Sequence, residues 1–586
     1  MATPDTKRWL PTSVKEVRER GWDELDVILF TGDAYVDHPS FGTAVIGRIL
    51  EAEGYRVAVV PQPNWRDDLR DFRKLGRPRL FFGVSAGNMD SMVNHYTANL
   101  RLRSDDAYTP GGKAGFRPDY ACTVYTRILK ELYPDTPVIL GGIEASLRRL
   151  THYDYWSDTV KPSILAESGA DLISYGMGDK TVPMIAKALH NGFNMNLLRQ
   201  LPQVAFLADR KYVEERPDTL VFHPYEKCVT DPQAFGKNFV RMETESNRLE
   251  ARRIAEPHGD RFVVVNPPAP PLTEAELDRT YDLPFTRLPH PRYAGKGDIP
   301  AYEMIKFSVN LHRGCFGGCS FCTISAHQGK FVSSRSPQSV LREVETLTRM
   351  DGFKGYLSDL GGPSANMYGM RGRNTELCRR CVRPSCIWPN LCGNLNRDHG
   401  PLQELYRQVR AVKGIKKAFI GSGIRYDLFI GDEDGTYLEE VVRHHVSGRL
   451  KVAPEHTCPH VLKLMRKPPF DLFYKLDEAF RDVCARHDLR YQLIPYFISS
   501  HPGCDENDMK HLAIITRRLH MHLEQVQDFT PTPMTLSSVM FATGRNPYTG
   551  EKVFVARRQE DKRKQKQYFF TSTRPGVARK HAKNRR

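Results

Sequence analysis

The chain concentrates its cysteines in one region, and this constrains the fold more than any other feature. Seven of the 12 cysteines lie between residues 315 and 392. A secreted disulfide protein of this length would scatter them. Clustering of this kind predicts metal ligation instead.

The first set lies in the string CFGGCSFC, with the spacing C-x3-C-x2-C at Cys315, Cys319 and Cys322. Thiolates are soft ligands that suit iron–sulfur clusters and zinc. The two central glycines let the loop fold closely around an inorganic core. Three thiolates can hold three irons of a four-iron cluster and leave the fourth iron open to a small ligand, whereas a closed zinc site takes four ligands. Zinc and three ordinary thiols are the alternatives.

A second set follows within 60 residues of the first, with the spacing C-x2-C-x4-C-x5-C. Four cysteines at this spacing predict a closed four-thiolate site, either structural zinc or a second iron–sulfur cluster. Neighbouring arginines would lower the thiol pKa and favour ligation. Disulfides are the remaining alternative. The set consists of Cys378, Cys381, Cys386 and Cys392.

Residues 1–200 alternate short apolar runs with helix-like stretches. This alternation predicts an N-terminal Rossmann-like α/β domain, with a parallel sheet covered by helices. Two glycine turns, Gly141-Gly142 and Gly176-Met177-Gly178, follow strand candidates at the edge where such sheets bind ligands, although glycines also simply end strands. Residues 201–300 lose the periodicity and contain a proline-rich run, which predicts a connecting segment. The expected strands are 26–30, 56–60, 80–84, 137–140 and 171–175.

Residues 301–530 resume the alternation with six strand–helix steps. Six steps in about 230 residues suit a partial (β/α)6 barrel. The second cysteine set then lies in an insertion, residues 362–400, between the second strand and its helix. The expected strands are 305–311, 355–359, 417–421, 450–453, 492–498 and 523–528. The expected helices are 337–350, 402–412, 437–445, 459–465, 470–487 and 505–520.

A strand followed by CFGGCSFC resembles the signature of the radical S-adenosylmethionine superfamily, including the aromatic residue before the third cysteine. The strings DLGGPSANMYG and TPTPMTLSSVMFATGRNPYTGE, together with the N-terminal α/β domain, resemble the YgiQ family within it, over nearly the whole chain. The resemblance implies a [4Fe–4S] cluster, S-adenosyl-L-methionine bound to its open iron, a reducing electron donor and a 5′-deoxyadenosyl radical that abstracts hydrogen. It indicates the chemistry and leaves the substrate open.

The resemblance also implies that polar turns at the ends of later barrel strands face the cofactor. The turn Gly361-Gly362-Pro363 looks like the one that meets the cofactor's amino group, although proline replaces the usual acidic residue and backbone carbonyls must take its role. Ser422 and Arg425 could reach the ribose or the carboxylate. Glu455 could bind the ribose. Each of these assignments is weak alone, and together they support one another.

The N-terminal domain also looks like the cobalamin-binding domains of some radical methyltransferases, which often carry Asp-x-His-x-x-Gly. This chain has Asp37 and His38 adjacent, in the string DHPSFG, so the lower-ligand motif is not matched. Cobalamin could bind only without that histidine ligand. We expect a structural or substrate role for the domain instead.

The formal charge is +16, and much of the excess lies at the C-terminus. Between Glu551 and Arg586 there are 13 Lys and Arg residues against 3 Asp and Glu residues, a net charge of +10. We therefore expect residues 531–586 to form a basic, partly disordered extension, which could bind RNA through phosphate charge or could simply keep the chain in solution.

Two functions from different classes follow from these patterns. The first is a radical S-adenosylmethionine enzyme that acts on RNA, protein or a metabolite, by methylation or sulfur insertion among other reactions. The second is a non-catalytic, nucleic-acid-associated iron–sulfur protein. The set of cofactor-facing turns favours the first. No long apolar run and no secretory signal are visible, so a cytoplasmic protein without membrane contact is expected.

Overall fold

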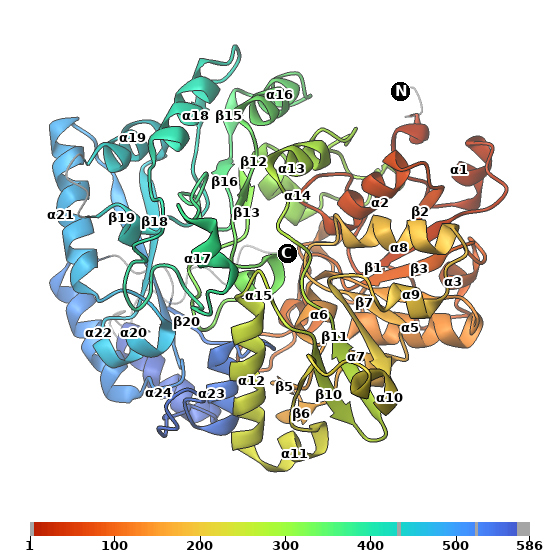
Figure 1. Cartoon of the computed structure of the whole chain (residues 1–586). Helices are drawn as coiled ribbons and strands as arrows, with labels where there is room; N and C mark the ends of the chain where they lie inside the picture. The colour runs from red at the N-terminus through yellow and green to blue at the C-terminus, as the bar shows by residue number, and fades with distance from the viewer. Residues whose placement is uncertain (1–4, 431–434, 522–525, 571–586) are drawn as a thin grey trace, which may run out of the picture.

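The chain folds into two α/β halves that lie against each other. The computed structural model describes residues 5–430, 435–521 and 526–570. Figure 1 shows one half, red to yellow, around a large sheet, and the other, green to blue, around several short parallel sheets. The two halves meet along the segments that carry the polar turns.

The first half is built on a nine-stranded mixed sheet of order β2-β1-β3-β4-β7-β8-β11-β10-β9. Strands β2, β1, β3, β4 and β7 pair in parallel, and β1, β2 and β4 are buried throughout. Burial on both faces is what helices on both sides of a parallel sheet impose. The parallel strands are β1 (Val27–Thr31), β2 (Val57–Pro61), β3 (Phe81–Ser85), β4 (Val138–Leu140) and β7 (Leu172–Ser174).

The expectation of a connecting segment over 201–300 is wrong for its first part. Residues 204–265 add four strands to the sheet, three of them through antiparallel pairing. Only β10 and β11 follow each other directly, whereas α10 (Arg210–Glu214), α11 (Tyr225–Thr230) and α12 (Pro232–Ser246) lie between β8 and β10, so the segment continues the sheet without a regular parallel β–α–β repeat. The proline-rich run comes directly after the last of these strands. The four added strands are β8 (Val204–Ala208), β9 (Leu220–Val221), β10 (Ile254–His258) and β11 (Arg261–Val265).

Helices of the first half cover the sheet and its edges (Figure 1). A small hairpin, β5 (His152–Asp154) with β6 (Thr159–Lys161), lies outside the sheet. The helices are α1 (Val14–Glu19), α2 (Gly42–Ala52), α3 (Arg70–Arg73), α4 (Ser91–His95), α5 (Ala121–Leu132), α6 (Gly142–Leu147), α7 (Ile164–Ser168), α8 (Thr181–His190), α9 (Met195–Leu198), α10 (Arg210–Glu214), α11 (Tyr225–Thr230), α12 (Pro232–Ser246) and α13 (Glu274–Tyr281).

The second half contains the expected six strand–helix steps, but its strands form separate short sheets: β12 with β16, β15 with β17, and β18-β19-β20, all parallel. The first strand starts later than expected because α14 (Pro300–Ile305) occupies its predicted beginning. The strands are β12 (Ser308–Asn310), β13 (His312–Arg313), β14 (Ser333–Ser334), β15 (Tyr356–Leu357), β16 (Asp359–Gly361), β17 (Lys417–Ala418), β18 (Arg449–Glu455), β19 (Gln492–Ser499) and β20 (Val526–Asp528).

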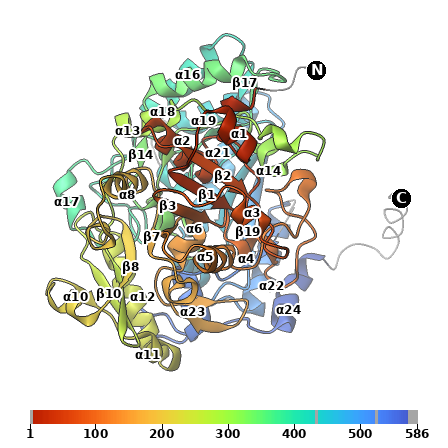
Figure 2. The same ribbon diagram turned by 90° about the vertical axis from the view of Figure 1, so that its right-hand side faces the viewer.

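The barrel helices match their predicted positions closely, because their apolar faces repeat at helical spacing. Residues 522–525, at the start of the sixth expected strand, lie outside the described residues. Figure 2 shows α17, which belongs to the cysteine-rich insertion, at the edge of the molecule. The helices are α15 (Ile324–Gln328), α16 (Pro337–Thr348), α17 (Thr375–Arg379), α18 (Gly400–Ala411), α19 (Thr436–His445), α20 (Pro459–Met465), α21 (Asp471–Arg486) and α22 (Glu506–Arg518).

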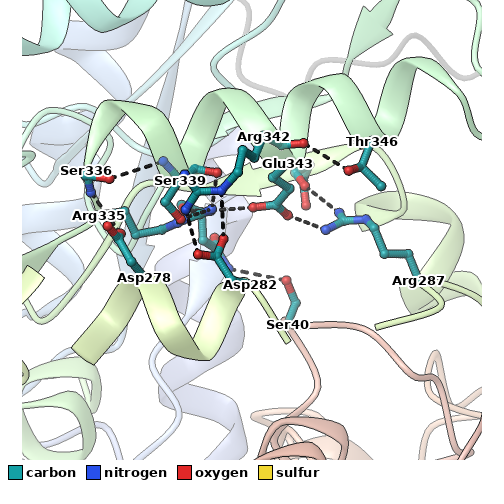
Figure 3. A network of polar contacts seen from close by, with 12 residues as sticks. Ser40, Asp278, Asp282, Arg287, Arg335, Ser336, Ser339, Arg342, Glu343 and Thr346 are labelled. Atoms are coloured by element: carbon teal, nitrogen blue, oxygen red, sulfur yellow. Dashed lines mark hydrogen bonds and ion pairs between the residues drawn. The ribbon is translucent and has the colours of Figure 1, made fainter. Parts of the chain in front are cut away.

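A buried ionic network joins the two halves (Figure 3). Glu343 on α16 accepts hydrogen bonds from both Arg287 and Arg335, and all three side chains are almost fully buried. Arg287 also donates to the Ser308 carbonyl oxygen at 2.9 Å. Asn310 Nδ2 on β12 donates to Ser40 Oγ in the sheet half at 3.3 Å. This network fixes the first barrel strand against the edge of the large sheet.

The expected disordered extension is ordered over most of its length. Helix α23 (Leu536–Thr543) packs on α12, as Figure 1 shows, and α24 (Gln559–Phe570) packs on α22. Lys562 and Gln565 of α24 are 2% and 1% exposed. Only residues 571–586 of the basic extension lie outside the described residues. Within those described residues, no helix has both the length and the apolar character needed to span a bilayer.

Candidate functional site

The loop with the first cysteine set, residues 315–322, packs against two segments that are distant in sequence. A Cβ on Gly318, whose φ is +61°, would lie 2.2 Å from the Pro384 carbonyl oxygen. Only glycine fits this position, because both the backbone conformation and the space exclude a side chain. A Cβ on Gly317 would lie 2.9 Å from Nη1 of Arg425. The loop therefore adopts the tight path that its glycines predict.

Backbone and guanidinium N–H groups point at the sulfur atoms of this loop. Gly317 N donates to Cys315 Sγ at 3.4 Å, and Arg425 Nη1 donates to Cys319 Sγ at 3.2 Å. Burial raises the pKa of Cys315 to about 11 and that of Cys322 to about 12, so both thiols lose their proton only to a strongly bound cation. This donor set fits an iron–sulfur cluster. In the described part of the chain, no three His, Cys, Asp or Glu side chains already converge on one point, so the ligand assignment stays a prediction.

The glycine-rich turn lies at the end of β16, next to the strand that leads into the cysteine loop. A Cβ on Gly362 would lie 2.5 Å from the His312 ring, and one on Gly361 would lie 2.7 Å from Ser422 Oγ. The Ser422 hydroxyl donates to the Asp359 carboxylate, whose second oxygen accepts from Ser422 N at 3.1 Å. Ser422 thus joins two strand ends instead of presenting a free hydroxyl. Burial raises the pKa of Asp359.

Arg425 and Glu455 belong to a group of four charges beside the cysteine loop. Arg425 donates from Nε and Nη2 to both oxygens of Asp427, at 2.9 and 2.6 Å, while its Nη1 contacts Cys319. Glu455 lies 3.6 Å from Lys467, and burial raises the pKa of this carboxyl while Lys467 opposes the rise. The φ of Glu455 is +67°, a strained value of the kind found at binding sites. Lys467 carried no signal in the sequence, because only the fold brings it here.

The four thiols of the second set are near neighbours in the insertion, although they do not converge on one point. Asn394 Nδ2 donates to Cys378 Sγ at 3.4 Å, and Nζ of the buried Lys330 lies 3.6 Å from Cys381 Sγ. Burial raises the pKa of Cys386 to about 11, and the Lys330 charge opposes that rise. The electrostatic neighbours of Cys386 are the three remaining members of the set, Cys378, Cys381 and Cys392.

The arginines of the insertion do not have the role that the sequence suggested. Arg379 and Arg380 pair with Glu250 on the first half, at 3.0 and 3.7 Å, and the lysine beside the thiols supplies the nearby positive charge. The insertion also touches the first loop, because Cys386 N donates to the Phe316 carbonyl oxygen at 3.0 Å. The two cysteine sets are therefore adjacent in the fold as well as in the sequence.

The DHPSFG string is structural. Asp37 accepts hydrogen bonds from Nε and Nη2 of the buried Arg48. His38 is fully buried, its Nδ1 accepting from Ser40 N at 3.0 Å and its Nε2 contacting Arg287 Nη2 at 2.8 Å. Both ring nitrogens are thus engaged by protein groups. His38 is not placed as a metal ligand.

A cavity of about 430 Å³ separates the sheet from the barrel. One wall is the carboxyl edge of the parallel strands, with the turns Gly141-Gly142 and Gly176-Met177-Gly178. The opposite wall consists of β12, β13, α15 and Pro363 of the glycine-rich turn. The glycine turns therefore border a real cavity, at the place where doubly wound sheets bind ligands.

Comparison with protein families finds two matching regions. Residues 9–308 match the family described as Radical SAM N-terminal, and residues 524–571 match a domain of unknown function, DUF3362. A UPF0313 protein of Bacteroides thetaiotaomicron is 58% identical, with 96% of this chain and 94% of the relative covered. One of Porphyromonas gingivalis is 60% identical over 96% and 90%, and one of Methanocella arvoryzae is 47% identical over 94% and 90%.

Two kinds of solved structure are similar at low identity. The radical S-adenosylmethionine methyltransferase TsrM from Kitasatospora setae, with cobalamin and a [4Fe–4S] cluster bound, is 15% identical with a TM-score of 0.48, covering 87% of this chain and 77% of that one. The cobalamin-dependent S-adenosylmethionine radical enzyme OxsB is 11% identical with a TM-score of 0.46, covering 89% and 55%.

Proposed function

We propose how the cofactors are held in this chain, which belongs to the UPF0313 family and carries its Radical SAM N-terminal domain. The protein is a radical S-adenosylmethionine enzyme with a [4Fe–4S] cluster, and its substrate is open. We assign the cluster to Cys315, Cys319 and Cys322. The observation that carries this assignment is the set of N–H donors directed at the sulfurs of one tight, glycine-dependent loop.

S-adenosylmethionine is assigned to the turns beside this loop. Gly361 and Gly362 bring the backbone of this turn close to Ser422 and His312, where a side chain would not fit, and the backbone carbonyl groups of the turn are assigned to the cofactor's amino group. Glu455 and Arg425 present opposite charges to the ribose and carboxylate. Ser422 acts through Asp359 rather than by direct contact. Cys315, Cys319 and Cys322 would hold the cluster, which, once reduced by an external one-electron donor, would supply the electron for cleavage of the cofactor's sulfonium to methionine and a 5′-deoxyadenosyl radical that abstracts hydrogen from substrate.

The second cysteine set is assigned to a second metal site, either zinc or an iron–sulfur cluster. Anaerobically reconstituted protein should then contain about eight irons per chain for two clusters, or about four irons and one zinc. Cobalamin remains the less favoured occupant of the cavity, because His38 is engaged. We place the enzyme in the cytoplasm, where a reducing environment keeps both cysteine sets as thiols.

The test is anaerobic incubation of cluster-loaded protein with dithionite and S-adenosylmethionine, followed by measurement of 5′-deoxyadenosine. The wild type should form it, and Cys319→Ala should not. Cys484→Ala, which removes a buried thiol of α21 outside both sets, is the matched control and should behave as the wild type. An intact cluster without 5′-deoxyadenosine formation would refute the enzymatic function and favour the non-catalytic alternative.

A further inference from the structure

The cavity between the sheet and the barrel offers an uncharged environment to whatever occupies it. Its only two oppositely charged lining residues among those described, Arg313 and Asp179, pair with each other at 2.7 Å. Burial lowers the pKa of His312 and of His327 to about 4, so both imidazoles are neutral near pH 7. The walls are mostly apolar. A neutral, largely flat organic group is therefore the suitable occupant.

His312 supplies two unpaired polar atoms to the wall of this cavity. The side chain is 1% exposed and lines the cavity, and within the described residues neither ring nitrogen has a hydrogen-bond partner. Leaving two buried polar atoms unpaired is costly, so a ligand is expected to satisfy them. A neutral imidazole donates from one nitrogen and accepts at the other. This combination suits a heterocycle with both donors and acceptors on its edge, such as a nucleobase.

A second hollow, here called the groove, continues from the cavity and is lined by charged residues. The two share the segment Gly176-Met177, Arg313, His327 and Gln328 in their walls. Only one carboxylate, Glu245, lines this groove among the described residues, and Lys180 is in addition paired with Glu276. The groove therefore carries an excess of positive charge, although Arg248 and Arg252 share Glu245 and Arg313 pairs with Asp179. Its cations are Arg149, Lys180, Arg248, Arg252, Arg313 and Lys330.

Arg149 is a cation of this groove with no carboxylate partner among the described residues. It is 4% exposed. Its Nη1 donates to the Ser146 carbonyl oxygen at 2.6 Å, its Nε has no partner, and its guanidinium lies 4.6 Å from the Tyr175 ring. A buried charge without a partner is expensive. The same arginine also borders a hollow beside Cys319, so an anion bound to it would lie close to the cysteine loop.

We propose that cavity and groove together bind a nucleotide as the substrate of the radical reaction, with its base against His312 and its phosphate on Arg149. This rests on the proposed function and names its substrate class. The neutral cavity suits the base, and the basic groove suits phosphate, which an arginine fork binds well. A free nucleotide and a nucleotide unit of a single-stranded RNA share this chemistry. In the RNA case the base is turned out into the cavity while the backbone follows the groove.

Binding to the cluster-loaded full-length protein, measured both without and with saturating S-adenosylmethionine, tests the proposal and separates the two sources. The probes are a fluorescein-labelled mixed-sequence 12-nucleotide RNA, followed by anisotropy, and adenosine and uridine 5′-monophosphates, followed by equilibrium dialysis. Tight binding of the RNA alone identifies a polynucleotide substrate, and tight binding of a monophosphate identifies a free one. For the RNA, each lost phosphate contact reduces the magnitude of the negative slope of log affinity against log salt by about 0.7.

Arg149→Met should weaken the binding of the effective probe about tenfold or more, because it removes a charge-assisted contact. It should not lower the melting temperature of ligand-free protein, because it also removes an unpaired buried charge. Arg70→Gln, which removes an exposed charge on α3, is the matched control and should bind as the wild type. His312→Phe, with the iron content checked, should also weaken binding, since it fills the space without hydrogen bonds.

Three results would overturn the proposal. The first is that neither probe binds, and the second is that Arg149→Met binds as tightly as the wild type. The third is that S-adenosylmethionine displaces the nucleotide, which would make the cavity the cofactor's own site. The proposed function fails independently, by absence of 5′-deoxyadenosine from wild-type protein. A wild type that forms 5′-deoxyadenosine but binds no nucleotide therefore refutes only the substrate assignment.

Discussion

Gly318→Ala should disturb both cysteine sets at once. The φ of Gly318 is +61°, where a residue with a side chain costs about 1–2 kcal/mol. Its new Cβ would also lie 2.2 Å from the Pro384 carbonyl oxygen, so the two segments must separate, which costs about 1–3 kcal/mol by analogy with overpacking. The free energy of unfolding should therefore fall by about 2–5 kcal/mol.

The shift in a urea unfolding curve of metal-free protein measures this destabilisation, and iron and sulfide analysis after anaerobic reconstitution measures its effect on metal uptake. Gly393→Ala, in the cysteine-rich insertion, is the matched control, since a Cβ there meets nothing within 4 Å. It should change stability by less than about 0.5 kcal/mol. If both variants unfold alike and bind equal iron, the close packing of loop and insertion is not what the cysteine sets depend on.

Three further predictions follow from buried or charged groups. Glu343→Gln should lower stability by about 3–5 kcal/mol, because it leaves two buried arginines without their carboxylate; a urea unfolding curve checks this. The melting temperature should fall as pH drops from about 6.5 toward 3, because burial lowers the pKa of His501 to about 3 and only the unfolded chain binds the proton in this range. His501→Gln should make this fall less steep, and His487→Gln should not. Removing 571–586 should weaken RNA binding and reduce its salt dependence if these residues bind RNA, and unchanged affinity would exclude residues 571–586 as the contact; Gln559–Phe570 must stay because it is docked.

Local patterns predicted the elements that local forces decide. The helix expected at 459–465 has those bounds, because its apolar spacing and initial proline both act within one segment. The strands at 204–208 and 261–265 were missed because they pair antiparallel across a segment that contains α10, α11 and α12, and no local pattern indicates such a long-range pairing. Lys562 and Gln565 were missed for another reason. A helix docked through buried polar side chains has no amphipathic signal, so its charges resembled those of a free tail.

The residues of the candidate site also divide into those that a local pattern predicted and those that only the fold brings together. The cysteine spacing is a short-range feature, and it was visible in the sequence. Lys467 and Arg149 have no motif around them, since each acquires its role only when distant segments meet. Ser422 shows the converse, because its position was predicted but the carboxylate that engages its hydroxyl was not.

The contacts between the two cysteine sets bear on what a metal in the insertion would do. Cys386 N donates to the Phe316 carbonyl oxygen, and Ser385 Oγ lies within hydrogen-bond distance of the carbonyl oxygens of Phe316 and Gly317, at 3.3 and 2.8 Å. These bonds hold the backbone between the first two cysteines of the catalytic loop. A metal on the insertion, even a zinc without redox chemistry, would therefore order that loop as well as its own segment, because the insertion's backbone is part of the loop's support. We infer that a metal in the insertion would support the shape of the first cysteine loop.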